Sequence, residues 1–436
     1  MSTIKRLDPI LVILCLILAA CTLPGITTTP IVETLLPNVT PSTQAVVDTP
    51  VTGTSPTSKR PLSTPIAGTA QPMTLTSIKM FDSLHGWASA AGDTDKHPHL
   101  LTTSDGGTTW KEMTPAGMAA ETGYADSLIL FTALDANTVW ATLSSQSPSP
   151  LLTTLITWGT TDGGANWFSS DPLPVTDLAV EFFMPDYFGF SDKNNGWLLV
   201  HNGAGMNHDY VSIFTTKDGG ASWKRIVDPF MDNLMMSCSK TGLAFFDALR
   251  GWVTIDCHGV KNGLDFYTTS DGGNTWQAVT LPSPGVEPGY FDNMDNACGL
   301  DGIVYVAKPL LTVSVTCMHY GISDPNRWLY SSTDEGTTWS WHATPGGYGD
   351  TFFLTPTQAW FLGHIKQQDG YANTLYATSD SGVNWAPVKN VNWGGIPQFV
   401  DAQNGWLIAR AGPETAFVRT TNGGKTWVEV KAVIVP

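Results

Sequence analysis

The stretch "TTSDGGTTW" (102–110) decides the fold, because close copies of it recur along the chain. The copies are "GTTDGGANW" (159–167), "TTKDGGASW" (215–223), "TTSDGGNTW" (268–276), "SSTDEGTTW" (331–339), "ATSDSGVNW" (377–385) and "RTTNGGKTW" (419–427). An acid beside glycines, hydroxyl side chains and a tryptophan suits three structures: a metal-binding loop, a catalytic loop or a turn between strands. The regular recurrence indicates a repeat architecture.

A second motif, an acid followed by Gly-Trp or a close variant, precedes these copies and ends at Trp87, Trp140, Trp197, Trp252, Trp360 and Trp406. The missing copy is recovered by shifting residues 238–257 forward by 60 onto 298–317, where Thr312 replaces Trp252. Cys298 and Cys317 then fall on Cys238 and Cys257. Seven units of about 53 residues therefore fill positions 73–436.

Each unit contains four short candidate strands, which in the first unit are "SIKMF", "GWASA", "HLLTT" and "TWKEM". No stretch has convincing helical periodicity, so the pattern predicts an all-β fold, a seven-bladed β-propeller over 73–436. Charged residues make up only 14% of the chain, which suits sheets that are mostly covered by their neighbours.

The consensus "S-x-D-x-G-x-T-W" is that of the Asp-box, or BNR repeat. Its alternation with "D-x-x-x-G-W" resembles the photosystem II stability and assembly factor-like propellers. The resemblance implies the fold, but Asp-boxes also occur in sialidases, xyloglucanases and sortilin-type receptors, so it implies less about function. The assembly-factor relatives are non-enzymatic and dock partly through an arginine-rich patch, whereas the arginines here are dispersed.

A turn explains the composition of the repeated stretch. Asp105 supplies an acceptor for backbone N–H groups, and Gly106 and Gly107 tolerate positive φ. One acid per copy is too few for a calcium loop, which needs about six to eight oxygen ligands. Asn422 in the last copy still accepts hydrogen bonds but replaces a catalytic carboxylate poorly. We therefore predict structural roles for Asp105, Trp110, Asp162, Trp167, Asp218, Trp223, Asp271, Trp276, Asp334, Trp339, Asp380, Trp385, Asn422 and Trp427, and also for the second-motif acids Asp82, Asp135, Asp192, Asp247 and Asp401.

The four cysteines of the repeat region flank equivalent hairpins in neighbouring units. In an oxidising compartment this arrangement predicts two disulfides, Cys238–Cys257 and Cys298–Cys317. The alternative, a four-cysteine zinc site, lacks the close C-x-x-C pairs that such sites use.

Residues 1–20 combine a basic start with a short apolar run, which predicts an export signal. The run ends in "LAAC", which resembles a lipoprotein lipobox and implies cleavage before Cys21 and its lipidation; a plain signal peptide with an incidental cysteine is the alternative. Residues 21–72 are rich in Thr, Ser and Pro and predict a disordered linker. We therefore expect a membrane partner through the lipid and a location at the cell surface or the periplasmic face of a membrane.

The charge of the chain excludes one class of partner. Of the total of −16, the leader contributes +1 and the linker nothing, so the propeller region carries −17. Such an acidic surface repels phosphate backbones, and we expect no nucleic-acid binding.

Both repeated motifs are expected on one face of the propeller, which leaves the long connections on the other. Residues there predicted to contact a ligand are Asp186, Tyr187, Tyr290, Phe291, Asp292, Tyr348 and Asp350. Aromatic rings beside carboxylates suit a carbohydrate, a cationic ligand or a protein loop, although packing of long loops over the blades is the alternative.

Two enzyme classes are alternatives to a binding protein. The five arginines beyond the linker do not suggest a sialidase triad, and a xyloglucanase-like enzyme needs two opposed carboxylates and usually a second propeller. The histidines at 97, 99, 201 and 208 are expected to be solvated rather than metal ligands. The sequence prediction is a monomeric binding or assembly scaffold for a protein or glycan partner, without enzymatic activity, cofactor or metal. A glycoside hydrolase is the alternative.

Overall fold

The computed structural model describes residues 62–93, 97–121, 124, 127–145, 154–175, 183–205, 208–229, 237–257, 264–285, 290–293, 296–319, 325–367 and 370–435. The chain divides into two compact units, 1–57 and 58–436, and the described residues belong to the second. The predicted leader, Cys21 and most of the predicted linker lie outside the described residues.

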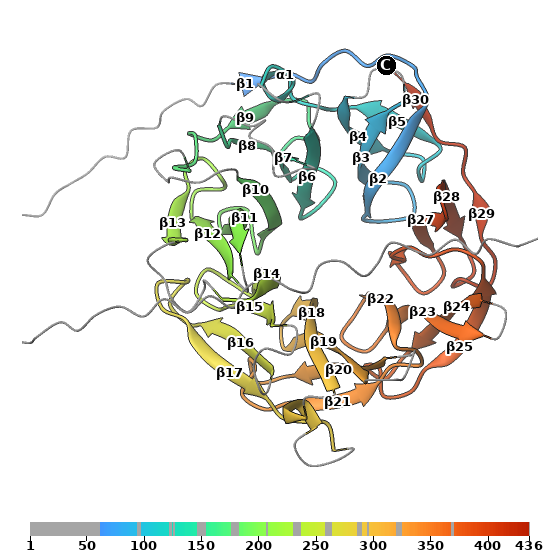
Figure 1. Ribbon diagram of the computed structural model, residues 1–436. Helices are drawn as coiled ribbons and strands as arrows, with labels where there is room; N and C mark the ends of the chain where they lie inside the picture. Colours follow the sequence, from blue (N-terminus) through green and yellow to red (C-terminus); the bar gives the residue numbers. More distant parts are fainter. Residues whose placement is uncertain are drawn as a thin grey trace, which may run out of the picture. The chain divides into compact units, whose positions relative to one another are not determined.

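Within these ranges, 30 strands form seven sheets arranged as a ring (Figure 1), which confirms the predicted seven-bladed propeller. The first blade consists of β2 (Met73–Met80), β3 (Gly86–Gly92), β4 (Pro98–Thr103) and β5 (Thr109–Glu112). The second consists of β6 (Ser127–Ala133), β7 (Val139–Ser145), β8 (Thr157–Thr160) and β9 (Trp167–Ser169). The third consists of β10 (Met184–Phe190), β11 (Gly196–Gly205), β12 (His208–Thr216) and β13 (Lys224–Val227).

Blades four to seven repeat the same antiparallel order. The fourth blade consists of β14 (Ser239–Phe245), β15 (Gly251–Asp256), β16 (Leu264–Thr269) and β17 (Gln277–Leu281), and the fifth of β18 (Asn296–Ala307), β19 (Leu310–His319), β20 (Asn326–Ser332) and β21 (Ser340–Ala343). The sixth consists of β22 (Tyr348–Phe353), β23 (Ala359–Gln367), β24 (Gly370–Thr378) and β25 (Ala386–Val391). The seventh consists of β26 (Gln398–Phe399), β27 (Gly405–Ala411), β28 (Glu414–Thr420) and β29 (Val428–Glu429).

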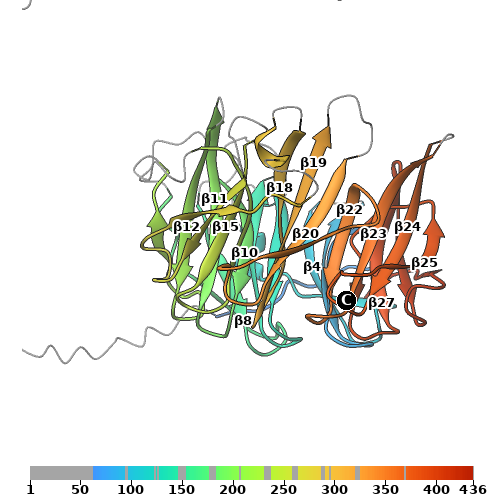
Figure 2. The same cartoon turned by 90° about the horizontal axis from the view of Figure 1, so that it is seen from below.

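The strands run between two faces of the ring (Figure 2). Because each blade is a four-stranded meander, the turns after its first and third strands lie at one face, here called the turn face. The opposite end is called the connection face. Helical structure in the described residues is limited to α1 (Ala116–Ala119) and the short 3₁₀ helix η2 (Tyr290–Asp292). None of the described helices has the length and apolar character required to cross a bilayer.

The second-motif tryptophans pack one blade against the next. Trp87 Nε1 donates to the Ala136 carbonyl of the second blade at 2.9 Å, and Trp140 Nε1 donates to the Gly219 carbonyl of the third at 2.8 Å. Both side chains are almost completely buried. Burial of such large aromatic surface is the main source of cohesion between the blades.

The repeated stretch forms the turn between the third and fourth strands of every blade. Asp105 accepts hydrogen bonds from the Thr109 N–H at 2.8 Å and from the Thr109 hydroxyl at 2.6 Å, while Gly106 and Gly107 have φ of 77° and 90°. Partial burial acts to raise the pKa of Asp105, but these hydrogen bonds and those from Thr103 and Thr108 hold it below its ordinary value. The pKa of Asp271 is lowered to about 2, first by the N–H of Thr275 and then by its hydroxyl.

Asn422 occupies the same position in the last blade. Its Oδ1 accepts from the Thr426 N–H at 2.9 Å, and its Nδ2 donates to the Thr426 hydroxyl at 2.8 Å. The turn therefore needs an acceptor at this position rather than a charge.

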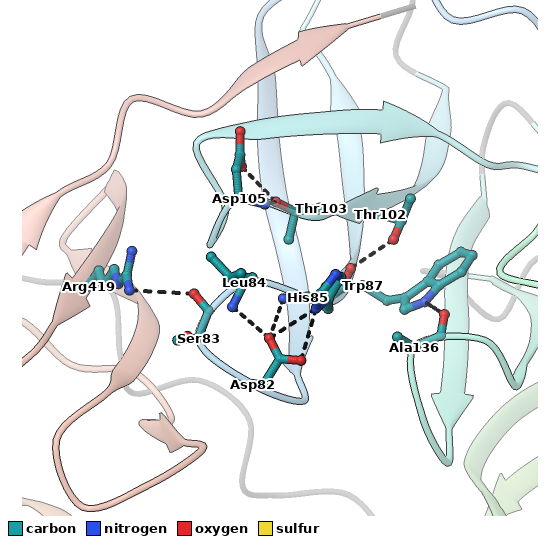
Figure 3. A network of polar contacts seen from close by, with 11 residues as sticks. Asp82, Ser83, Leu84, His85, Trp87, Thr102, Thr103, Asp105, Ala136 and Arg419 are labelled. Carbon is teal, nitrogen blue, oxygen red and sulfur yellow. Dashed lines mark hydrogen bonds and ion pairs between the residues drawn. The ribbon is translucent and has the colours of Figure 1, made fainter.

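The second-motif acids also stabilise turns (Figure 3). Asp82 accepts from the N–H groups of Leu84 and His85 at 2.7 and 2.8 Å. The same two contacts, to the residues two and three positions later, recur at Asp135, Asp192, Asp247 and Asp401.

The fifth blade confirms the alignment of residues 298–317 with residues 238–257, which placed the missing copy of the second motif. Cys298 and Cys317 are paired across β18 and β19 and form a disulfide, and Cys238–Cys257 forms the second. Thr312 is fully buried at the position of Trp252 and its hydroxyl lies 3.1 Å from that of Ser331. Both predicted disulfides are therefore confirmed, and the zinc alternative is wrong.

The chain closes the ring at its outer edge. β30 (Val433–Val435) adds to β5 in parallel, and Trp406 of the last blade donates to the Gly106 carbonyl of the first at 3.0 Å. β1 (Leu62–Ser63) pairs with β9 of the second blade. Residues 62 and 63 are thus already part of a sheet, ten positions before the predicted end of the linker.

Substitutions at Asp105 test the acceptor requirement of the turn. We expect Asp105→Asn to reproduce the Asn422 arrangement and to change the free energy of unfolding by less than about 0.5 kcal/mol, whereas Asp105→Ala should cost about 1 kcal/mol because the N–H groups lose their acceptor. Urea unfolding of both variants measures the difference. Equal losses of stability in the two variants would show that the turn depends on the negative charge of Asp105 rather than on a hydrogen-bond acceptor.

Candidate functional site

Three adjoining hollows lie at blades four to six. Hollows B and C run along the first, innermost strands, and hollow A lies beside them, next to β20, β21 and β23. Hollow A, of about 420 Å³, includes Tyr290, Arg327 and His364 in its lining. Hollow B, of about 400 Å³, is lined by residues of β18, β19 and β22. Hollow C, of about 280 Å³, is lined by Tyr187 and by residues of β14 and β18. A and B share Arg327, and B and C share residues 301–304, so together they form one feature, the inner-strand groove.

Irregular pairing in the innermost strands shapes this groove. A β-bulge interrupts the pairing of β10 between Asp186 and Gly189, that of β14 between Lys240 and Gly242, and that of β18 between Leu300 and Gly302. Bulges redirect side chains and occur often beside active sites. The extra residue is Thr241 in β14, and the equivalent residue in β18 is Asp301.

The Asp301 carboxylate in the groove is held by hydrogen bonds from two neighbouring side chains. Its Oδ2 accepts from the Thr316 hydroxyl at 2.7 Å and from Arg327 Nε at 3.1 Å. Arg327 is itself 7% exposed, and its Nη1 donates to the Thr351 hydroxyl of the sixth blade at 3.2 Å. Asp301 thus lies at the junction of two blades, with Asp350 on the wall of the same hollow.

A second charged cluster lies beside hollow C, on β10, β11 and β12. His201 Nδ1 contacts Asp209 Oδ1 at 2.8 Å, and its Nε2 lies 3.7 Å from Asp186 Oδ2. Burial acts to lower the pKa of His201, but hydrogen bonding to Asp186 and Asp209 and their negative charges raise it to about 9. The imidazole is therefore positively charged at neutral pH.

Tyr187 connects this cluster to the groove. It has φ of 42°, a left-handed conformation that is strained for a bulky residue. Its hydroxyl donates to the Lys240 carbonyl at 3.4 Å, and burial, with the charges of Asp186 and Asp209, raises its pKa. Because the phenol stays neutral, it can stack or donate a hydrogen bond but is not a nucleophile.

The structure brings most of the predicted ligand residues to this region. Tyr187, Tyr290, Tyr348 and Asp350 line the hollows, and Asp186 contacts His201. Phe291 is 6% exposed and packs in the core of the fifth blade against Tyr330, so its surroundings are those of a packing residue. Asp292 ends η2, and its side chain lies outside the described part of the chain.

Sequence reasoning missed Asp301 and Arg327 as site residues. One sequence signal for this site was available. The residue four positions after each second-motif tryptophan lies near the connection face, so polar residues at that position are candidates for a site there. That position holds His201 in the third blade and His364 in the sixth, and in the fifth it holds Thr316, which contacts Asp301. Across the described residues, no group of three His, Cys, Asp or Glu side chains could hold a metal ion.

Comparison with known proteins gives relatives for part of the chain. No protein-family model matches the sequence. The chain is similar to a xyloglucanase from Paenibacillus sp., with 23% identity over 301 residues that cover 59% of this chain and 26% of the relative. It is also similar to xyloglucanase Xgh74A from Acetivibrio thermocellus, with 25% identity over 284 residues that cover 53% of this chain and 30% of the relative. The chain thus matches less than a third of the length of these relatives.

A solved structure supports the fold. The GH74 xyloglucanase from Xanthomonas campestris superposes with a TM-score of 0.52, covering 86% of this chain and 55% of that one at 11% identity. Likeness at this identity shows the propeller fold alone.

The sequence relatives correct one prediction. They are enzymes named for a polysaccharide, which overturns the prediction of a protein without enzymatic activity and favours the glycoside hydrolase alternative. The assembly-factor resemblance stays a prediction.

The charge on His201 predicts how stability depends on pH. Because the folded state raises the pKa from 6.5 to about 9, the stabilisation is fully present below pH 6.5 and is lost as the pH rises through 9. We expect His201→Gln to remove this loss, so that its free energy of unfolding falls less between pH 6.5 and 9.5 than that of the wild type. Chemical denaturation at several pH values across this range measures the free energy of unfolding of both proteins. If the two free energies change in parallel with pH, the positive charge assigned to His201 is wrong.

Proposed function

We propose that this propeller binds a polysaccharide along the inner-strand groove and hydrolyses a glycosidic bond within it. The observation that carries the proposal is the presence of two acids, Asp301 and Asp350, in the lining of hollow B. Glycosidases place two carboxyl groups about 5–10 Å apart on either side of the scissile bond, and a hollow of about 400 Å³ is large enough for a sugar ring. The xyloglucanase relatives support a glycan as substrate.

The surroundings of the two acids suggest their roles. Arg327 and Thr316 hold the Asp301 carboxylate in place, as a nucleophile or general base requires. Asp350, which has no hydrogen bond or ion pair with any described residue, is assigned the role of the acid that protonates the departing oxygen. As that bond breaks, Asp301, or a water that it deprotonates, attacks the anomeric carbon.

The rest of the groove suits a chain of sugars. Tyr348, which is 37% exposed, lines hollow B, and Tyr290 and Trp328 line hollow A. Aromatic walls with a few polar groups are typical of small-molecule and glycan sites. Three hollows in a row provide places for consecutive sugar units.

Hydrolysis by the full chain tests the proposal. We expect release of reducing ends from at least one plant or microbial polysaccharide, with xyloglucan as the first to assay. Asp301→Asn and Asp350→Asn should each lower kcat by about 100-fold or more, with smaller effects on KM, because each removes a proton-transfer or nucleophilic group.

Asp401→Asn is the matched control, because Asp401 is an acid in a turn on the opposite face. It should retain wild-type activity. Hydrolysis that survives both groove substitutions, or the absence of hydrolysis on every glycan tested, would contradict the proposal.

We further propose that the protein is anchored outside the cytoplasm by lipid on Cys21. The supporting feature is the "LAAC" sequence after a short apolar run. Mass spectrometry of the membrane-extracted protein should show a mature chain that begins at Cys21 and carries acyl mass, and Cys21→Ala should abolish that species. An unmodified mature chain beginning elsewhere would overturn the anchor.

A further inference from the structure

We infer that hollow A is a subsite for an acidic sugar, whose carboxylate binds at Arg327 and His364. The inference rests on the proposed function, because it places this sugar next to the acids of hollow B. It defines the substrate class as a polysaccharide bearing uronic acid units, whereas the relatives are named for xyloglucan.

Arg327 carries a donor, Nη2, that no described residue accepts. Its Nε donates to Asp301, its Nη1 donates to Thr351, and its guanidinium lies 5.4 Å from the centre of the Phe361 ring. Nη2 has no acceptor among the described residues. A guanidinium has five N–H donors, so the Nη2 amino group remains available to a ligand. A ligand oxygen in hollow A, which Arg327 lines, would supply the missing acceptor.

The charge of hollow A is opposite to that of the rest of the groove. Of the described residues that line it, Arg327 and His364 are basic and none is acidic. Hollow B, in contrast, contains Asp301 and Asp350. Arg327 also pairs with Asp301 at 3.1 Å, but in a propeller region that carries −17, hollow A is the part of the groove whose own lining has a cation and no carboxylate.

His364 is held in one tautomer by a chain of hydrogen bonds. Asn373 Nδ2 donates to the Trp393 carbonyl at 2.8 Å, so Asn373 Oδ1 is the acceptor that faces His364 Nδ1. Nδ1 must then carry a proton, and Nε2 has no partner among the described residues, so Nε2 accepts a hydrogen bond when the ring is neutral and donates one when the ring is protonated. Arg327 Nη2 and the Nε2–H of a protonated His364, from neighbouring blades, are thus two donors in one lining, as two carboxylate oxygens require.

The remaining walls favour a sugar over a free ion. Trp328, Pro325 and Pro345 supply apolar surface, and the Tyr290 hydroxyl accepts a hydrogen bond from Asn326 at 3.0 Å while keeping its own proton for a ligand. An apolar wall with a few convergent polar groups is the usual composition of a site that orients a ring.

The test compares one ligand in two charge states. Xylo-oligosaccharides bearing glucuronic acid, and the same oligosaccharides after chemical reduction of the carboxyl group, are titrated calorimetrically into the full chain carrying Asp350→Asn, so that the ligand is not consumed. We expect the acidic form to bind about tenfold more tightly, as one charge-assisted contact provides, and the advantage to shrink with added salt.

Two substitutions then identify the groups responsible. Arg327→Met and His364→Gln, each in the Asp350→Asn background, should reduce the affinity ratio between acidic and reduced ligand toward one. His342→Gln, on β21 of the fifth blade and outside the hollow, should leave the ratio unchanged. Thermal unfolding reports whether the buried Arg327 is needed for folding, and the His364 variant tests the subsite independently of it.

The outcomes separate the two proposals. Equal affinities for the two ligand forms, a ratio that survives both substitutions, or tighter binding of a sulfated than of a carboxylated ligand would overturn the subsite. If neutral glycans are cleaved and ligand charge makes no difference, the hydrolase stands and the subsite fails. If the acidic ligand is preferred but no glycan is cleaved, the subsite stands and the hydrolase fails.

Discussion

In three of the seven repeats, the indole of a buried tryptophan donates to a backbone carbonyl in a turn of the next blade. Trp87 reaches Ala136, Trp140 reaches Gly219, and Trp406 closes the circle at Gly106. The acceptor carbonyl lies in a turn that an Asp or Asn side chain stabilises, so turn geometry and blade spacing are set together. Once these contacts fix the ring, the positions of the innermost strands and of the groove between them follow.

The fifth blade is where the repeat and the site meet. Thr312 stands in place of the tryptophan, and the same blade has the bulge that presents Asp301. Part of its contact with the sixth blade is polar, through Arg327 and Thr351, and lies beside hollow B. A departure from the repeat is tolerated there because neighbouring blades on both sides keep the ring closed, so this position is available for chemistry.

Much of the fold was predictable because its determinants are local in sequence. Glycines with positive φ, an acceptor and a tryptophan within nine residues specify each turn, and the cysteine pairs lie on adjacent strands. Asp301 and Arg327 were not predictable in this way, since a bulge shifts the register of one strand and the guanidinium contacts a different blade. The proposed hydrolytic site was not predicted because its candidate acids lie on separate repeats and have no motif in common.

The placement of β1 has a mechanical consequence. β1 joins the propeller through two residue pairs, Leu62 with Phe168 and Ser63 with Trp167, on the outermost strand of the second blade. A pulling force on β1 is therefore applied at the rim and would peel away a two-residue strand first. The innermost strands, in other blades and at the centre of the ring, would carry almost none of the load (Figure 1). The groove is thus mechanically insulated from a force applied at β1.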